Sequence, residues 1–303
     1  MPTQPIDPRL FALLEAIRDT GKLTNATVLT GLPYRQAWGM IGKWTGIIGR
    51  PLVVKKQGRG TRLTPFGDRL LWLRERVEAR LAPHLESAVS EIEQQLNGVL
   101  DEQRPTLTVQ ASHDLVLAEL REFLRTGHEL ELDVRFAGSM DSVAALSKGR
   151  CDLAGFHVPE GATGEEIVAT YQPWLKPRPQ RLIHFVRRQQ GLILPAGNPQ
   201  QIFSFADIAR QKARFINRQK GSGTRIAVER LLAEQGIGED DIPGFHSEEF
   251  THLAVAAAVA SGMADVGFGI EAAARKLRLQ CVPLFTEDYY LLVRKGALDL
   301  ESV

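Results

Sequence analysis

Beyond residue 105, four turns place small or hydroxyl-bearing residues where a helix is expected to begin. These residues are Ser112, His113, Gly138, Ser139, Ser222, Gly223, Thr224, Arg225, Thr251 and His252. The first turn of a helix has free backbone N–H groups and the positive end of the helix dipole, so it favours an anion. A single Ser or Thr there is equally well explained as a helix cap. Four such turns meeting in one cleft would instead predict a site for a small anion.

Arginine and histidine side chains could complete such a site. Arg218 and Arg225 would add positive charge, unless each pairs with Asp or Glu on the opposite side of the cleft. His113, His157 and His252 lack HExxH or comparable spacing, so we expect them to line the pocket or to donate to a ligand. We expect no metal and no cofactor.

The same turns carry no recognisable catalytic motif. Residues 221–224 lack the GxxxxGK[ST] pattern of a phosphate loop, and no GxSxG motif surrounds Ser222. No nucleophile–base pair stands out in the sequence either. We therefore expect a binding protein and not an enzyme.

Alternating strands and helices must position these turns. Strand patterns occupy residues 106–112, 131–139, 151–156, 182–197, 213–219, 264–270 and 280–296, and helices are expected at 114–127, at 140–149, after 221–224 and after 251. This alternation predicts parallel sheets with crossover helices. Two such sets joined by long strands predict two lobes and a cleft between them. We expect this domain at 105–303, with lobe I at about 105–190 and 284–303 and lobe II at about 191–283.

The N-terminal part of the chain has a different pattern. Helices are expected from Asp7 or Pro8 to residue 20, from the capping residues Thr24 and Asn25 to residue 30, and from Pro33 to about residue 48. A hairpin with a basic tip follows at 52–63. Two short helices around a Gly-containing turn match a helix-turn-helix, and the hairpin matches a wing. We therefore predict a winged helix-turn-helix DNA-binding domain at 1–65.

Charge is distributed unevenly along the chain. Residues 1–70 hold eleven Lys and Arg against four Asp and Glu, a formal charge of +7 in a chain whose net charge is +1. A basic head on an acidic body is typical of nucleic-acid binding, although a basic face alone is weak evidence. The expected partner is a double-stranded DNA operator.

A long helix is expected from Phe66 to about residue 100, after a cap at Thr64. Its apolar seam consists of Leu70, Leu73, Val77, Leu81, Leu85, Val89, Ile92 and Leu96. Such a helix packs either on a second copy of itself or on the effector domain of its own chain. DNA half-sites usually occur in pairs, which favours the second copy. We assign 66–104 to a linker and dimerisation helix and expect a homodimer or homotetramer.

Three stretches of the head, LTNA at 23–26, GLPYRQAW at 31–38 and LTPFG at 63–67, resemble ModE-type molybdate regulators. GRPL at 49–52 shares the layout of LysR-type heads. The resemblance implies that Tyr34 and Arg35 read bases. Trp38 either touches a thymine methyl or joins the core, and we favour the core. It also implies backbone contacts from Thr24, Asn25, Lys43, Arg59 and Arg62. The wing departs from the ModE pattern because its tip has only the short 58–60 glycine-rich stretch.

Residues from about 106 to 295 resemble a type 2 periplasmic-binding-protein fold. The matching stretches are GRCDLAGFH at 149–157, RQQGL at 188–192, NRQKGSGTR at 217–225 and THLAVAAAVASGMADVG at 251–267. They are similar to the periplasmic-binding-protein-like (PBP-like) domain fused to ModE-type heads or to molybdopterin-biosynthesis enzymes. The resemblance implies a sensor of molybdate or tungstate, with formate or another small carboxylate second. An enzyme or carrier for a molybdopterin-like ligand is the remaining alternative.

Composition is that of a soluble globular protein. Hydrophobic residues make up 44% and charged residues 24% of the 303, and the two cysteines are far apart. The N-terminus has no export-leader pattern, and no apolar run is long enough for a membrane span. We expect a cytoplasmic protein of multidomain α/β class, with no membrane partner. Its expected parts are a winged helix-turn-helix, a long linker helix and a two-lobed PBP-like domain.

Overall fold

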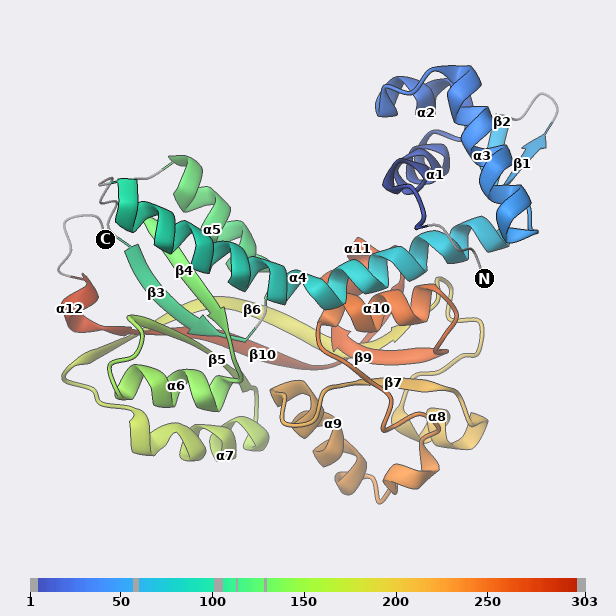
Figure 1. Ribbon diagram of the computed structural model, residues 1–303. Coiled ribbons are helices and arrows are strands. Elements are labelled where there is room, and N and C mark those ends of the chain that lie inside the picture. Colours follow the sequence, from blue (N-terminus) through green and yellow to red (C-terminus); the bar gives the residue numbers. More distant parts are fainter. Residues whose placement is uncertain (1–4, 57–59, 101–105, 113, 128–129, 299–303) are drawn as a thin grey trace.

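A long helix, α4 (Pro65–Leu100), runs across the molecule and joins a small head to a larger α/β body (Figure 1). The computed structural model describes residues 5–56, 60–100, 106–112, 114–127 and 130–298. Arg59 in the expected hairpin turn, the linker at 101–105 and His113 lie outside these ranges. Within the described ranges, no helix is long and apolar enough to cross a lipid bilayer.

The head consists of three helices and a hairpin. They are α1 (Pro8–Thr20), α2 (Leu23–Thr30), α3 (Tyr34–Ile48), β1 (Val53–Lys56) and the antiparallel β2 (Gly60–Leu63). The Asp7 carboxylate accepts a hydrogen bond from the backbone N–H of Arg9 and caps α1, as expected. Gly21, Gly31 and Gly49 end the three helices in the left-handed conformation that glycine adopts most readily.

The start of the second helix corrects one expectation. The N-cap of α2 is Lys22, so Thr24 and Asn25 lie inside its first turn and do not cap it. Packing explains this start, because Leu23 and Ala26 are buried in the core shared with α1 and α3. Thr24 and Asn25 are exposed.

Helix α4 begins where the hairpin ends. Thr64 Oγ1 accepts a hydrogen bond from the Gly67 N–H at 3.0 Å and caps the helix. A Cβ at Gly67 would overlap the carbonyl oxygen of Leu52, so glycine allows the hairpin to approach this closely. Further along, α4 packs on α10 (His252–Ala260) of the body, where Thr251 Oγ1 donates to the Ala79 carbonyl at 3.0 Å. Of the two arrangements expected for the long helix, packing on its own body is observed.

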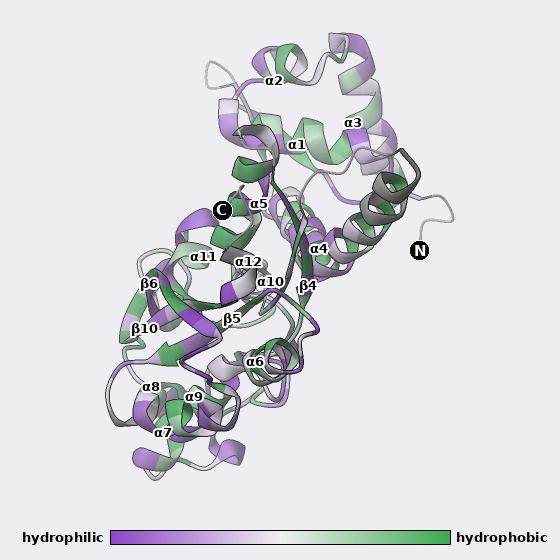
Figure 2. Cartoon of the chain, turned by 90° about the vertical axis from the view of Figure 1, so that its left-hand side faces the viewer, coloured by the Kyte–Doolittle hydropathy of each residue, from purple (hydrophilic) through white to green (hydrophobic). Residues whose placement is uncertain are grey.

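An apolar stripe of α4 nevertheless remains uncovered. Seven side chains at intervals of three or four residues are between 40% and 61% exposed; they are Leu73, Val77, Leu81, Leu85, Val89, Ile92 and Leu96. Figure 2 shows hydrophobic and hydrophilic residues alternating around this helix. We call these seven residues the exposed stripe. The exposed stripe therefore lies on a different face of α4 from the one that packs on the body.

The described strands of the body form one mixed sheet of eight. They are β3 (Thr106–Ala111), β4 (Glu131–Phe136), β5 (Leu153–Pro159), β6 (Gln180–Leu194), β7 (Phe215–Arg218), β8 (Glu248–Glu249), β9 (Val266–Ile270) and β10 (Gln280–Arg294). Their order is β4-β3-β5-β10-β6-β9-β7-β8. Strands β3 to β5 are parallel and so are β7 to β9, whereas β10 is antiparallel to β5 and β6, and β6 to β9.

The expected parallel pairing is present within each of the two sets, and the strands that join the sets add antiparallel pairs. Strands β6 and β10 are fifteen residues long, so both pass from one parallel group to the other and join the two groups into one sheet (Figure 1). The long joining strands themselves were expected. We call the β3–β4–β5 end lobe I and the β7–β8–β9 end lobe II.

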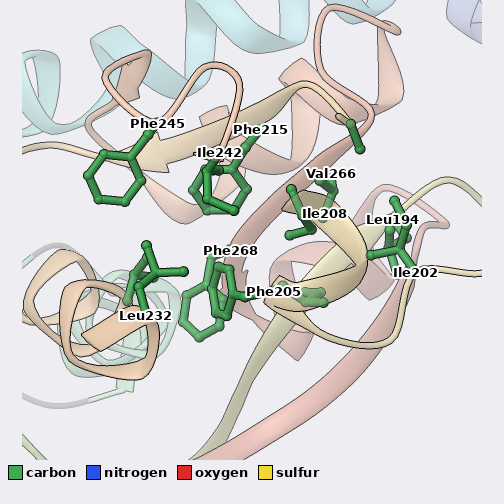
Figure 3. Packing of buried hydrophobic residues seen from close by; sticks show 13 residues of the cluster. Leu194, Ile202, Phe205, Ile208, Phe215, Leu232, Ile242, Phe245, Val266 and Phe268 are labelled. Carbon is green, nitrogen blue, oxygen red and sulfur yellow. The ribbon is translucent and has the colours of Figure 1, made fainter. Parts of the chain in front are cut away.

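Helices cover both lobes. Lobe I carries α5 (Leu115–Gly127), α6 (Ser139–Ser147) and α7 (Ala162–Tyr171); lobe II carries α8 (Phe205–Gln211), α9 (Gly223–Glu234), α10 and α11 (Glu271–Lys276), and α12 (Lys295–Leu298) follows β10. Each lobe has its own buried apolar core. The core of lobe II centres on Phe205, Phe215 and Phe268 (Figure 3). The lobes can therefore keep their internal packing while their relative position changes.

The two long strands are irregular where they pass between the lobes. Gly191 of β6 pairs with Pro283 of β10 and with Gly269 of β9, and a Cβ on Gly191 would overlap the Val282 carbonyl oxygen. The register of β10 against β6 shifts between Pro283 and Phe285. Such a bulge bends the local ladder, so we place the hinge of the body here.

One ion pair joins α7 of lobe I to α9 of lobe II. The Arg230 guanidinium donates to both carboxylate oxygens of Glu166. Glu166 is 68% exposed, so the pair is open to solvent and to salt. This pair is therefore a weak, salt-sensitive link between the two lobes.

Candidate anion-binding cleft

A cleft of about 390 Å³ lies between the two lobes. Lobe I contributes the ends of β3 and β4 and the start of α6, and lobe II contributes the turn before α9 and the start of α10. Eight of the expected site residues line it; they are Ser112, Gly138, Ser139, His157, Ser222, Gly223, Thr224 and His252. Three of the four expected turns are thus present with the hydroxyl, glycine and imidazole groups that the sequence predicted. The fourth, at 251–252, contributes His252 alone.

The side chain of Arg218 is the distinctive feature of this cleft. It is only 5% exposed, and its Nη2 and Nε donate to the Phe250 carbonyl at 3.0 Å and to Gln219 Oε1 at 3.1 Å. Among the described residues, no carboxylate lies within ion-pairing distance of it. Burial, followed by the positive charge of Arg188, lowers the pKa of Arg218 to about 10, while Glu287 and Asp114 act in the opposite direction from beyond ion-pairing distance. The guanidinium remains charged at neutral pH with no carboxylate in direct contact, which is costly for a buried group.

Arg188, which also lines the cleft, is in the opposite situation. Its guanidinium pairs with the buried carboxylates of Asp114 and Glu287. Burial alone would lower the pKa of Arg188, but the two carboxylates raise it above its usual value. The guanidinium of Arg188 is therefore engaged by carboxylates within the protein, whereas that of Arg218 has no carboxylate in direct contact and is the one available to a ligand.

His157 acts as a neutral group in this setting. Burial, followed by the charges of Arg188 and Arg218, holds its pKa well below the usual value. Its Nε2 lies 2.7 Å from Ser112 Oγ, and its ring lies over Tyr289 with the ring centres 4.2 Å apart. One of these two groups donates the shared hydrogen bond to the other, so the pair keeps one N–H or O–H with which to orient a bound oxygen without adding charge.

The helix starts divide between capping and cleft lining. Ser222 Oγ accepts from the Arg225 N–H at 3.2 Å and caps α9, and it also lines the cleft. Thr251 Oγ1 accepts from the Ala254 N–H and donates to the Ala79 carbonyl, each at 3.0 Å, so it has both hydrogen-bonding roles filled. Thr251 is not among the residues that line the cleft, and the cap explains it fully.

Arg225 must be removed from the candidate site. Its Nε donates to Glu229 Oε1 at 2.7 Å and its Nη1 to the Phe245 carbonyl at 3.0 Å. The guanidinium lies 3.9 Å from the centre of the Phe245 ring. These partners hold the side chain in the interior of lobe II. The expected alternative for Arg225 was a pairing with a carboxylate of the opposite lobe. It does pair with a carboxylate, but that of Glu229 in its own lobe.

A family model described as a PBP superfamily domain matches residues 120–303, which include most of both lobes. The chain belongs to this PBP-like family. The resemblance expected for the body is thereby confirmed.

Relatives of this PBP-like chain are found in several bacteria. The uncharacterized protein YvgK of Bacillus subtilis (strain 168) is 30% identical over 208 residues, which are 69% of this chain and 67% of that protein. The molybdenum-pterin-binding protein MopB of Rhodobacter capsulatus is 29% identical over 174 residues, 49% of this chain and 63% of that protein.

A shorter likeness extends to ModE. The transcriptional regulator ModE of Yersinia pestis is 37% identical over 71 residues, 22% of this chain and 27% of that protein. The expected resemblance to ModE proteins is confirmed over this length, and the chain spans about a quarter of ModE and under two thirds of MopB. The crystal structure of the LysR family transcriptional regulator CbnR matches 97% of this chain and 95% of its own, at 14% identity. Its TM-score of 0.43 is too low to support any statement about this chain.

Sequence reasoning missed several residues of the PBP-like cleft. Arg188 lines it from the joining strand β6, Lys220 from lobe II, and Arg80 and His84 from α4. Arg188 and Lys220 lie in stretches that carry the family resemblance, so that likeness was the available signal. The α4 residues have no local signal, because their place depends on how the helix packs on the body.

The residues expected to bind DNA lie on the surface of the head. Tyr34 and Arg35 are the first two residues of α3, and Tyr34 is 44% exposed. Lys43 and Arg62 are also exposed. Trp38 is half-buried and packs against the head core, in line with the alternative favoured from the sequence.

Proposed function

We propose that this PBP-like chain is a DNA-binding transcription regulator, not an enzyme, and that it senses a small anion in the cytoplasm. In this proposal residues 1–65 form a winged helix-turn-helix, 66–104 a linker helix and 105–303 the effector domain. The α1–α3 head with its hairpin supports the first assignment, and the ModE relative supports the role in transcription. The cleft between the lobes supports the third.

The observation that carries the proposal is the buried, unbalanced charge of Arg218. Four cationic side chains line the cleft against one carboxylate, Asp141, and the lining also includes the starts of α6 and α9. Arg188 is neutralised by its own partners, whereas Arg218 is not. An anion held there would give Arg218 a counter-ion in direct contact and accept bonds from Ser139 and from the one free donor of the Ser112–His157 pair.

Molybdate or tungstate is the first candidate for the effector. Several neutral donors around one arginine suit the oxygens of a tetrahedral oxyanion. The relative MopB, named as molybdenum-pterin-binding, supports molybdenum chemistry. Formate or another small carboxylate is the second candidate, because an arginine fork pairs well with a carboxylate. A cavity of about 390 Å³ also leaves room for an organic group beside the anion.

Calorimetric titration of the full chain with sodium molybdate, tungstate and formate tests the effector. We expect binding heat with molybdate or tungstate at micromolar concentration, and its loss in Arg218→Met. An absence of heat with both metal oxyanions would overturn the first candidate. Heat with formate alone would establish the second.

A mobility-shift assay on the promoter region of the chain's own gene tests DNA binding. Arg35→Ala should weaken specific binding about ten- to hundredfold, since a lost arginine–base contact costs roughly 1–3 kcal/mol. Arg275→Ala, at an exposed arginine of α11, is the matched control. Unchanged binding by Arg35→Ala would show that α3 is not the recognition helix.

We propose further that two copies pair through the exposed stripe of α4 to form a homodimer or homotetramer. Leu85 is 61% exposed at the middle of the stripe, and uncovered apolar residues in such a row are typical of an interface. Leu85→Lys should reduce the mass measured by light scattering to that of one chain. Leu182→Lys, at a 55% exposed leucine of β6, should leave it unchanged. A wild-type protein that is already monomeric would overturn this part.

A further inference from the structure

Helix α4 lies against the anion cleft as well as joining the head to the body. Its residues Arg80, Pro83 and His84 line the cavity that Arg218 also lines. Resting on the proposed function, we propose that Arg80 is a direct ligand of the bound anion. The helix that carries the head would then contact the bound anion directly.

Arg80 stands close to a carboxylate that another arginine already holds. Glu249 at the end of β8 is fully buried, and Arg76, one turn before Arg80 on α4, donates to its Oε1. Arg80 Nε lies 3.2 Å from Glu249 Oε2. That oxygen nevertheless accepts no hydrogen bond from the described residues, so the approach of Arg80 is close but poorly aligned. Arg80 is also 44% exposed, which leaves its guanidinium able to turn to a ligand.

Charge favours this exchange. Arg76 alone balances Glu249, so Arg80 can leave the carboxylate without stranding a buried charge. A second guanidinium beside Arg218 would complete a two-arginine clamp around the anion. Two arginines that share one anion repel each other less than two arginines in an empty cleft.

Pro83 gives the helix a route to pass the signal on. Proline has no N–H to donate to the carbonyl four residues earlier, which is that of Ala79. Thr251 Oγ1 fills this gap by donating to the Ala79 carbonyl at 3.0 Å. The weakest point of α4, around Pro83, is thus bonded to the start of α10 through the Ala79 carbonyl. Ala79 directly precedes Arg80 in the chain. A shift of Arg80 towards an anion acts on the helix at the place where it bends most easily.

Calorimetric titration of the full chain with molybdate and with formate tests the role of Arg80. Arg80→Gln should weaken binding of the active probe about tenfold or more, because a charge-assisted hydrogen bond contributes roughly 1.5–3 kcal/mol. Arg74→Gln is the matched control, since Arg74 is on α4 but pairs with Glu78 and Glu15. Equal affinity of wild type and Arg80→Gln would overturn this inference alone. A wild type that binds neither probe would overturn the proposed function and this inference with it.

A second measurement tests whether the signal of anion binding passes from the cleft through α4 to the head. The affinity for promoter DNA should change on adding the probe in wild type and in Thr251→Ser, which keeps the hydroxyl. Thr251→Val should still bind the anion but lose this change, because the Ala79 carbonyl has lost its donor. A response of Thr251→Val equal to that of wild type would overturn the route through α4.

Discussion

Two buried arginines of lobe II, Arg218 and Arg225, should respond in opposite ways to the same substitution. They are seven residues apart and only 5% and 3% exposed. Arg225 has a carboxylate, a carbonyl and an aromatic ring as partners. Arg218 has no carboxylate among the described residues. We therefore expect Arg225 to stabilise the fold and Arg218 to bind a ligand.

The size of the effect follows from the pKa of Arg218. Its lowering to about 10 means that the folded state disfavours the charged guanidinium by roughly 3 kcal/mol. Because a lowered cation pKa opposes folding at every pH below it, this cost is fully present at pH 7. Arg218→Met removes the cost but also the bond to the Phe250 carbonyl, roughly 1.5–3 kcal/mol for a charged donor. We expect the variant without ligand to be as stable as wild type or more stable by about 1 kcal/mol.

Arg225→Met should instead destabilise the protein by about 3 kcal/mol, because it removes the Glu229 pair, the contact with the Phe245 ring and one of the two hydrogen bonds that the Phe245 carbonyl accepts. Urea denaturation in buffer free of phosphate and sulfate measures both variants. Added molybdate at a hundred times its Kd should stabilise wild type by about 2.7 kcal/mol and should not stabilise Arg218→Met. A loss of stability in Arg218→Met as large as that in Arg225→Met would refute the reasoning, because Arg218 would then be a structural residue.

Three further predictions concern the body. Gly191→Ala forces a Cβ into backbone atoms of β10 and should cost about 3 kcal/mol or more in urea denaturation, whereas Gly296→Ala, where a Cβ meets nothing within 4 Å, should be nearly neutral. The hydrogen bond from Arg187 lowers the pKa of Asp288 to about 2, so this carboxylate stabilises the fold above about pH 4 and ceases to do so as the pH falls towards 2. Asp288→Asn should flatten the loss of stability in that range, and parallel curves would contradict the assignment. Glu166→Gln removes the inter-lobe pair and should speed anion release a few-fold in stopped-flow measurements at low salt; equal rates would show that the pair does not hold the lobes together.

Local signals predicted most of the elements. The ends of the head helices could be predicted because Gly21, Gly31 and Gly49 each take a left-handed conformation that other residues avoid. The caps at Asp7 and Thr64 were predictable for the same local reason. Helices α7, α8 and α11 have at most ten residues, so they repeat an apolar face too few times to be recognised.

Properties that depend on distant contacts were beyond the sequence. The mixed sheet arises because β10 inserts between two strands that are far earlier in the chain. Glu229, four residues after Arg225 on α9, is a local partner, but only the fold brings the Phe245 carbonyl and ring to Arg225 and leaves Arg218 without a carboxylate in contact among the described residues. The contribution of α4 to the cleft has the same origin, because it depends on packing between a helix and lobe II.

The central place of β10 has a consequence for synthesis of the chain. It is translated after every other strand of the sheet, yet it lies between β5 and β6 in the finished fold. Until it leaves the ribosome, these two strands have unpaired edges, which favour aggregation. The head is complete more than two hundred residues earlier and can fold first. A ribosome that stalls late would therefore release a folded head attached to a body whose sheet is incomplete; under the proposed function, such a product would bind DNA without responding to an effector.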